Sequence, residues 1–545
     1  MLSSLTAHYE NTVPPRWRKF APAIALALAV FIFYGNVYGN EFLFDDELLI
    51  QRNTLLQGWD TFWRLFTAST TEGAYIAGGF FRPVQMILYF FVYQVAGLST
   101  FAFHFLNVAL HAADACLLFG LGRKLGFDAR AAFLAVLLWA LHPVHTEAVT
   151  YMSATADGLF VFFCLIGLLM LPLVPTARKM LAVIPVFLLA LFSKETAVVF
   201  PLLAMAVIWF RNPGRVDYKN YLPVWPLLLI AACFIAWRLM SPAYDGPASY
   251  AHIYQAREYH NLQLYADQFG MRFYTFLATL PAYLGLLLWP AGLHMERSFP
   301  VSDSFWLLPV MAGAAMLIAA VIFIARADDK TWRPAKWGLL WFAASHAPDT
   351  GLLIAVNAIF LEHWMYLPSA GLFLGVGQSL YLFTERNSLK PARTYLVAAA
   401  LAVSLVFGGL TFMQNRTWRD PIVFYNHLFS FGTETARAHN NLGLAYGARG
   451  DYQHAVVEFN RAIAIGDTYA ETRHNLGLAL LSMPGAENNV EEAKANFLRA
   501  LEINPNFYRA CIALSQLYEH EGDKEKAESY RKRAEDILAR DKFNP

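Results

Sequence analysis

Charged residues are scarce in this chain. Of its 545 residues only 15% are Asp, Glu, Lys or Arg, 57% are hydrophobic, and the mean hydropathy is +0.37. A soluble protein of this length needs far more charge, so we expect most of the chain to lie in lipid. The 42 basic and 41 acidic residues nearly cancel and no basic domain stands out, which argues against a nucleic-acid partner.

Cysteine is scarce as well. Cys116, Cys164 and Cys233 lie in apolar runs, Cys511 lies near the C-terminus, and no two of them form a C-x-x-C pair. This number and spacing indicate neither a disulfide framework nor a cysteine metal site.

Long apolar runs, by contrast, are abundant. A helix that crosses a bilayer needs about 20 mostly apolar residues, and by that rule we predict an all-α membrane domain with about eleven transmembrane helices. The eleven runs are 20–40, 101–121, 131–149, 158–177, 180–192, 196–210, 222–240, 305–325, 337–356, 364–384 and 394–415. A further run, 271–292, would reverse the predicted side of the C-terminal tail if it crossed, so we expect it to be re-entrant.

Basic residues indicate the orientation, because cytoplasmic loops hold the excess of Lys and Arg. Arg16, Arg18 and Lys19 precede the first run, so we expect a cytoplasmic N-terminus. An odd number of crossings then places the tail on the other side, in the periplasm or a lumen. Later basic clusters lie at 123–130, 178–179, 211–219, 326–336 and 386–393.

The tail carries an internal repeat. Leu442-Gly443 and Leu476-Gly477 are 34 residues apart, and so are Ala493 and Ala527. This period, with small and large residues alternating at the helix contacts, is the tetratricopeptide signature, and we count about three repeats. The second unit is about four residues longer, which indicates an extra turn at Pro484-Gly485. We therefore predict a membrane domain at 1–415, a linker at 416–435 and a repeat α-solenoid at 436–545.

An acidic loop follows the first apolar run. Asp45 and Asp46 lie there between Glu41 and Glu47. A transferase that moves a sugar from a phospholipid to a hydroxyl needs a carboxylate that takes the acceptor proton, and adjacent aspartates can supply the base and its orienting partner or cation ligand. The alternative is a solvated acidic loop, which is the commoner meaning of a charge cluster.

A second polar cluster lies at the end of the run 131–149. His142, His145, Glu147 and Asp157 are costly at membrane depth unless they are paired or functional. We expect His145 to act on a donor phosphate and Glu147 on the acceptor. The spacing of the two histidines allows a metal, but no third ligand follows at helical spacing, so we predict no zinc site. The structural alternative is a capped helix end that Pro143 breaks.

Cationic side chains near the bilayer surface form a third group. Fixed cations stabilise the charge that develops on a departing polyprenyl phosphate, and Arg297 and His363 are the preferred pair. Each residue of the group also suits an interfacial anchor beside Trp or Tyr. The group comprises Arg82, Lys194, Arg297 and His363, with the adjacent carboxylates Glu195 and Glu362 as supporting residues.

The motifs together resemble a known family. FDDELLIQRN, FRPV, HPVHTEAV, SKE and EHWMYLPSAG, in this order and followed by the repeats, resemble the transmembrane and tetratricopeptide-repeat protein O-mannosyltransferases of the GT-C superfamily. The resemblance implies a GT-C membrane fold, a lipid-linked monosaccharide donor and inversion at the anomeric carbon. It assigns Asp45 and Asp46 to the catalytic acidic motif, and Glu362 and Tyr366 to the late motif.

Two departures concern the donor phosphate. The family tends to have Gly-Arg where this chain has Ala154-Thr155, and it tends to have Arg where this chain has His363. Both differences put phosphate contacts in doubt. The tail has fewer repeats than animal members carry, which fits a bacterial relative in the inner membrane.

Three other functions remain open from the sequence. A GT-C transferase could decorate a glycolipid or cell-wall polymer, since repeats bind peptides and partner proteins alike. A membrane-anchored scaffold would not need the acidic loop or the histidines. A transporter would need charged residues near the midplane and repeated halves, which we do not find. No cofactor is indicated, and a requirement for a divalent cation stays open.

Overall fold

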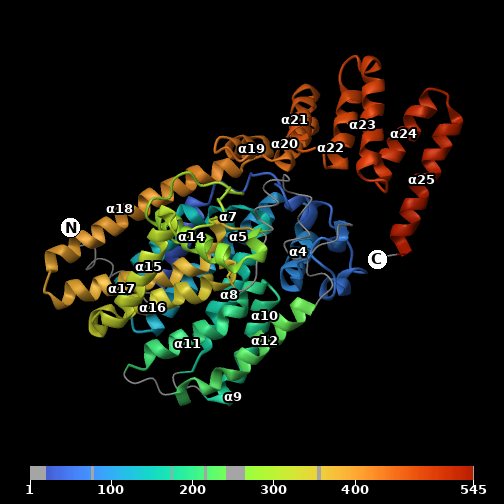
Figure 1. Ribbon diagram of the computed structural model, residues 1–545. Helices are drawn as coiled ribbons and strands as arrows, with labels where there is room; N and C mark the ends of the chain where they lie inside the picture. Colours follow the sequence, from blue (N-terminus) through green and yellow to red (C-terminus); the bar gives the residue numbers. More distant parts are fainter. Residues whose placement is uncertain are drawn as a thin grey trace. The chain divides into compact units, whose positions relative to one another are not determined.

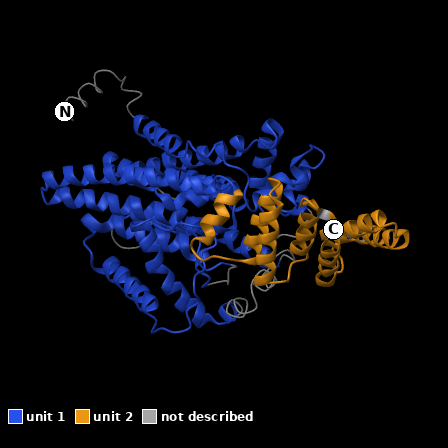
Figure 2. Ribbon diagram, turned by 90° about the horizontal axis from the view of Figure 1, so that it is seen from above, with its two compact units in different colours: residues 1–248, 261–420 blue, residues 249–260, 421–545 orange. Residues whose placement is uncertain are grey.

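The computed structural model describes residues 20–74, 79–172, 176–213, 218–240, 264–352 and 358–543. In these ranges all regular structure is helical, as predicted (Figure 1). The chain forms two compact units, residues 1–248 with 261–420 and residues 249–260 with 421–545 (Figure 2). The basic residues Arg16, Arg18, Lys19 and Arg215, used above for orientation, lie outside the described residues.

Six helical segments of the described chain are long and apolar enough to cross a membrane, so the chain is an integral membrane protein. The number rises to seven if α6 (Ala129–Ala140) and the segment Pro143–Thr150, bent by 53°, form one span. The count of about eleven stays a prediction. The six segments contain α5 (Thr100–Lys124), α8 (Thr155–Met170), α12 (Trp225–Met240), α14 (Phe269–Leu288), α15 (Leu308–Arg326) and α18 (Lys390–Gln414).

Five other predicted runs form shorter or more polar helices, and one helix was not predicted as a run. The five are α3 (Ala21–Phe33), α10 (Ile184–Leu191), α11 (Phe200–Arg211), α16 (Asp329–His346) and α17 (Tyr366–Arg386). The helix outside the predicted runs is α4 (Pro83–Ala96). The run 271–292 forms α14, one continuous helix that keeps Pro281 inside it, where a re-entrant segment was expected.

Glycines let α16 and α17 pack closely. A Cβ added at Gly371 would lie 2.2 Å from the Trp341 ring, and one at Gly375 would lie 2.3 Å from the Pro334 carbonyl oxygen. Close helix pairs of this kind use small residues at the contact. The pair fixes the start of α17, where Tyr366 lies.

The helices of the first unit break at short turns. Pro143 begins the 3-10 turn η5 (Pro143–His145) between α6 and α7 (Thr146–Thr150), because proline cannot continue a helix. The turn η7 (Glu195–Val199) separates α10 from α11. Between α16 and α17 lie η11 (Ala347–Thr350) and η12 (Glu362–Met365). These breaks carry most of the polar residues singled out above.

The second unit contains three helix pairs, as the repeat predicted (Figure 1). Gly443 and Gly477 face the rings of Phe459 and Phe497, and an added Cβ would lie 2.7 and 2.6 Å from them. The extra turn of the second pair is η14 (Ala486–Asn489), entered through Gly485 at φ +80°. The pairs are α20 (Ala436–Ala448) with α21 (Tyr452–Ile465), α22 (Ala470–Ser482) with α23 (Val490–Ile503), and α24 (Tyr508–His520) with α25 (Lys524–Phe543).

We expect Gly477→Ala to loosen the second repeat. Its methyl group would overlap the buried Phe497 ring, and overpacking of a core costs about 1–3 kcal/mol. Hydrogen exchange of the α22 and α23 amides in the full chain measures the loss. Gly447→Ala in α20 is the control, since nothing lies within 4 Å of its Cβ and alanine favours a helix. Equal protection in both variants would contradict the packing.

Candidate functional site

The acidic loop contacts a segment inside the second polar cluster, between Glu147 and Asp157. The backbone N–H and hydroxyl of Ser153 donate to Asp46 Oδ1 at 2.7 and 2.5 Å, and the N–H of Leu43 donates to Oδ2 at 2.9 Å. The N–H of Asp45 donates to the Tyr151 hydroxyl at 3.0 Å. Two regions that are over 100 residues apart in the sequence thus meet directly.

The two aspartates differ in their surroundings. Asp46 is buried, and burial raises the pKa of its carboxyl to about 7, although the bonds from Ser153 and Leu43 oppose the rise. Asp45 is half-buried and follows Phe44, whose φ of 52° turns the chain sharply. Because both oxygens of Asp46 accept protein hydrogen bonds, Asp46 suits a positioning role.

Two ion pairs lie on neighbouring turns. Arg82, at the start of α4, donates through two nitrogens to Glu195 at 2.7 and 3.1 Å. Lys194 donates to Asp157 at 2.6 Å, and both side chains are buried. Burial would raise the pKa of Glu195, but Arg82 outweighs it and lowers that pKa to about 2. The carboxylates predicted as supporting residues therefore hold the two cations in place.

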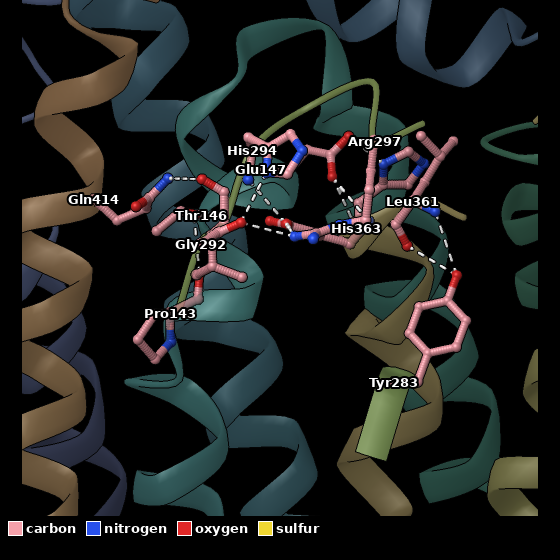
Figure 3. A network of polar contacts seen from close by, with 12 residues as sticks. Pro143, Thr146, Glu147, Tyr283, Gly292, His294, Arg297, Leu361, His363 and Gln414 are labelled. Carbon is pink, nitrogen blue, oxygen red and sulfur yellow. Dashed lines mark hydrogen bonds and ion pairs between the residues drawn. The ribbon is translucent and has the colours of Figure 1, made fainter. Parts of the chain in front are cut away.

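A further set of polar contacts joins α7 to η12 (Figure 3). Glu147 Oε2 accepts the backbone N–H groups of Glu362 and His363, both at 3.1 Å, and its Oε1 accepts from His363 Nδ1 at 2.8 Å. Glu362 Oε1 in turn accepts from Arg297 and from the His294 N–H, both at 2.9 Å. Both carboxylates are almost fully buried. The late motif is therefore fixed by the second cluster.

Two side chains of this set, Glu362 and His363, have pKa values above those of the free side chains. Burial, with Glu147 nearby, raises the pKa of Glu362 to about 8. Burial alone would lower the pKa of His363, but Glu147 and Asp157 outweigh it and raise that pKa. His363 therefore keeps its proton to higher pH than a free histidine.

A separate buried chain links Asp114, Tyr366 and His111. The Tyr366 hydroxyl lies 2.9 Å from Asp114 Oδ2 and 2.7 Å from His111 Nδ1, while His111 Nε2 lies 2.8 Å from the Ala140 carbonyl oxygen. Nε2 must carry a hydrogen, because a carbonyl only accepts. The Tyr366 hydroxyl has one proton, so it donates to only one of these two neighbours. The other neighbour must donate to the hydroxyl oxygen, so one further proton lies on either Asp114 or His111.

The remaining predicted residues lie in the interior of the first unit. His142 accepts the Val144 N–H at Nδ1 and contacts the Leu287 carbonyl oxygen at 3.0 Å through Nε2. His145 is buried against the rings of Trp139 and Tyr366, and neither ring nitrogen has a partner among the described residues. In the described ranges no three His, Cys, Asp or Glu side chains gather as a metal site would require.

The structure brings most of the predicted residues together and adds others. Sequence reasoning missed Asp114 and His111, although polar residues inside the apolar run 101–121 were a signal for them. It also missed Ser153 and Tyr151, which hold the acidic loop. No sequence signal distinguishes a serine or tyrosine that makes such a contact.

Comparison with known proteins points to one group of relatives. The tetratricopeptide-repeat family matches residues 436–465, 470–507 and 508–537. A protein O-mannosyl-transferase of Caenorhabditis elegans is 25% identical over 78% of this chain and 60% of its own length. Protein O-mannosyl-transferase TMTC4 of Homo sapiens is 25% identical over 82% of this chain and 66% of its own length. The chain thus spans less than two thirds of the length of these relatives.

We expect Tyr366→Phe to destabilise the first unit by about 2–4 kcal/mol, since two buried polar groups each lose a partner. Thermal unfolding of the detergent-solubilised chain measures the loss. Tyr395→Phe, at an exposed tyrosine of α18, is the control and should change stability by less than about 0.5 kcal/mol. A Tyr366→Phe protein as stable as the control would refute the shared-proton chain.

Proposed function

We propose that the protein is a membrane glycosyltransferase that moves mannose from a polyprenyl-phosphate carrier to hydroxyl groups of Ser or Thr in an acceptor protein. The observation that carries the proposal is the convergence of the acidic loop, the ion pairs and the late motif on the segment 147–157. The names of the relatives support the same activity. A scaffold would not need the acidic loop or the buried histidines, and ionisable residues inside a membrane domain are functional by default.

Asp45 is the base in this proposal. The acceptor hydroxyl oxygen attacks the anomeric carbon of the sugar from the face opposite the phosphate, and the bond from that carbon to the phosphate oxygen breaks. The electron pair of that bond leaves with the polyprenyl phosphate, while the hydroxyl proton passes to the Asp45 carboxylate. Inversion follows from the single displacement. Asp46 holds the loop in place through Ser153.

Arg297 and His363 face the phosphate. Their side chains are 24% and 18% exposed, whereas those of their partners Glu362 and Glu147 are 3% and 2% exposed. In both pairs the carboxylate therefore lies behind the cation, which leaves the cation turned toward the open side. Fixed cations in this arrangement stabilise the charge that grows on a leaving phosphate. Glu147 acts by orienting His363, so it positions the phosphate contact.

The reaction takes place on the extracytoplasmic face in this proposal, because the basic loops favour a cytoplasmic N-terminus. The repeat unit then lies on the same side as the acidic loop and binds the acceptor protein. Helix pairs of this type form surfaces that take up extended peptides.

We expect Asp45→Asn to lower kcat by about 10²–10⁴-fold, since it removes the proton acceptor. The assay is transfer of radiolabelled mannose from polyprenyl-phosphate mannose in membranes that contain equal amounts of each protein. Glu47→Gln is the control: this exposed neighbour pairs with Arg52 on the surface, and its loss should leave transfer unchanged. Equal incorporation by wild type and Asp45→Asn would overturn the proposal.

We expect Glu147→Gln to move the alkaline limb of the pH–rate profile to lower pH. Glu147 is one of the carboxylates that raise the pKa of His363, and the imidazolium is present only below that pKa. Without the charge of Glu147 the proton is lost at lower pH, so activity falls earlier as pH rises. An unshifted alkaline limb would show that His363 does not act as a cation.

A further inference from the structure

Asp349 is a carboxylate of the site that no sequence motif singles out. It lies in η11, which packs against η7, the turn that follows Lys194. Its side chain is half-buried and interacts electrostatically with Lys194 and His363. Asp157 and Glu195 are also within electrostatic range. Asp349 thus belongs to the cluster that connects the second ion pair to the late motif.

Asp349 differs from the other carboxylates of this cluster. Glu147 accepts three protein hydrogen bonds, Asp157 accepts from Lys194, and Glu195 is held by Arg82. With the described part of the chain Asp349 forms no hydrogen bond or ion pair. The nearby cations are already engaged, Lys194 by Asp157 and His363 by Glu147. Asp349 therefore retains acceptor capacity that the described residues do not use.

We propose that Asp349 accepts a hydrogen bond from a hydroxyl group of the donor sugar while His363 faces its phosphate. This inference rests on the proposed function. A sugar 1-phosphate carries an anionic group and neutral hydroxyl groups within one short molecule. The His363 cation, beside a carboxylate with unused acceptor capacity, matches that pattern. Asp349 is then a residue that selects the sugar.

Burial raises the pKa of Asp349 to about 7, and Lys194 and His363 oppose the rise. Near neutral pH a sizeable fraction of the group is therefore a carboxylate. As pH falls below 7 the carboxyl takes up a proton and becomes a weaker acceptor, so the affinity for the donor sugar weakens.

The test is steady-state kinetics of Asp349→Asn in membranes with polyprenyl-phosphate mannose. We expect KM for the donor to rise about tenfold and kcat to change less than about threefold, because a contact made equally in ground and transition states affects binding alone. Asp303→Asn is the matched control, since Asp303 is an exposed aspartate. It should leave both constants unchanged.

Deoxy donors show whether the contact is direct. With wild type, KM for one of the 2-deoxy, 4-deoxy and 6-deoxy mannose donors should be about tenfold higher than KM for the mannose donor. In Asp349→Asn, KM for the same deoxy donor should be little higher than KM for the mannose donor. A fall in kcat at unchanged KM, or equal deoxy penalties in both proteins, would overturn the proposal. If wild type transfers no sugar, the proposed function fails, and that result is distinct from either outcome.

Discussion

Charge buried away from water must be paired, and this constraint organises the first unit. An ionised group in a protein interior is costly unless a partner of opposite charge and further hydrogen bonds surround it. Lys194 with Asp157, and Glu147 with His363, meet this requirement across segments that lie far apart in the sequence. Each pair therefore fixes one helix break against another. Because removal of one partner would leave a buried charge, the pairs also hold the breaks at a single geometry.

The helix breaks bring polar groups from several helices to one place, which continuous helices of this length could not do. A continuous helix spreads its side chains around its axis, whereas a break turns the chain and leaves backbone N–H groups without helical partners. Glu147 accepts two such N–H groups, those of Glu362 and His363, at the start of η12. Pro143 ends α6 just before this site. The same residues thus satisfy the backbone and build the cluster.

The sequence predicted the helical class, the repeats and most residues of the cluster, because hydropathy and the 34-residue period are local signals. It offered an orienting role for one aspartate of the pair, but it did not predict that Ser153, 107 residues away, holds Asp46. Asp349 was missed for a similar reason, since a lone aspartate after a helix has many surface explanations. The early ends of α3 and α10 show that hydropathy measures how apolar a run is and says little about where the helix stops.

One short segment joins the two buried networks. Residues 362–366 carry Glu362 and His363 in the ionic cluster and Tyr366 in the chain with Asp114 and His111. The separation is only three residues, so a shift of Tyr366 moves the backbone N–H groups that Glu147 accepts. The proton shared by Asp114 and His111 keeps that chain neutral overall, whichever of the two carries it. A buried set of groups without net charge costs less than an unpaired ion, so this chain can stay buried without the opposite-charge partners that the ionic cluster needs.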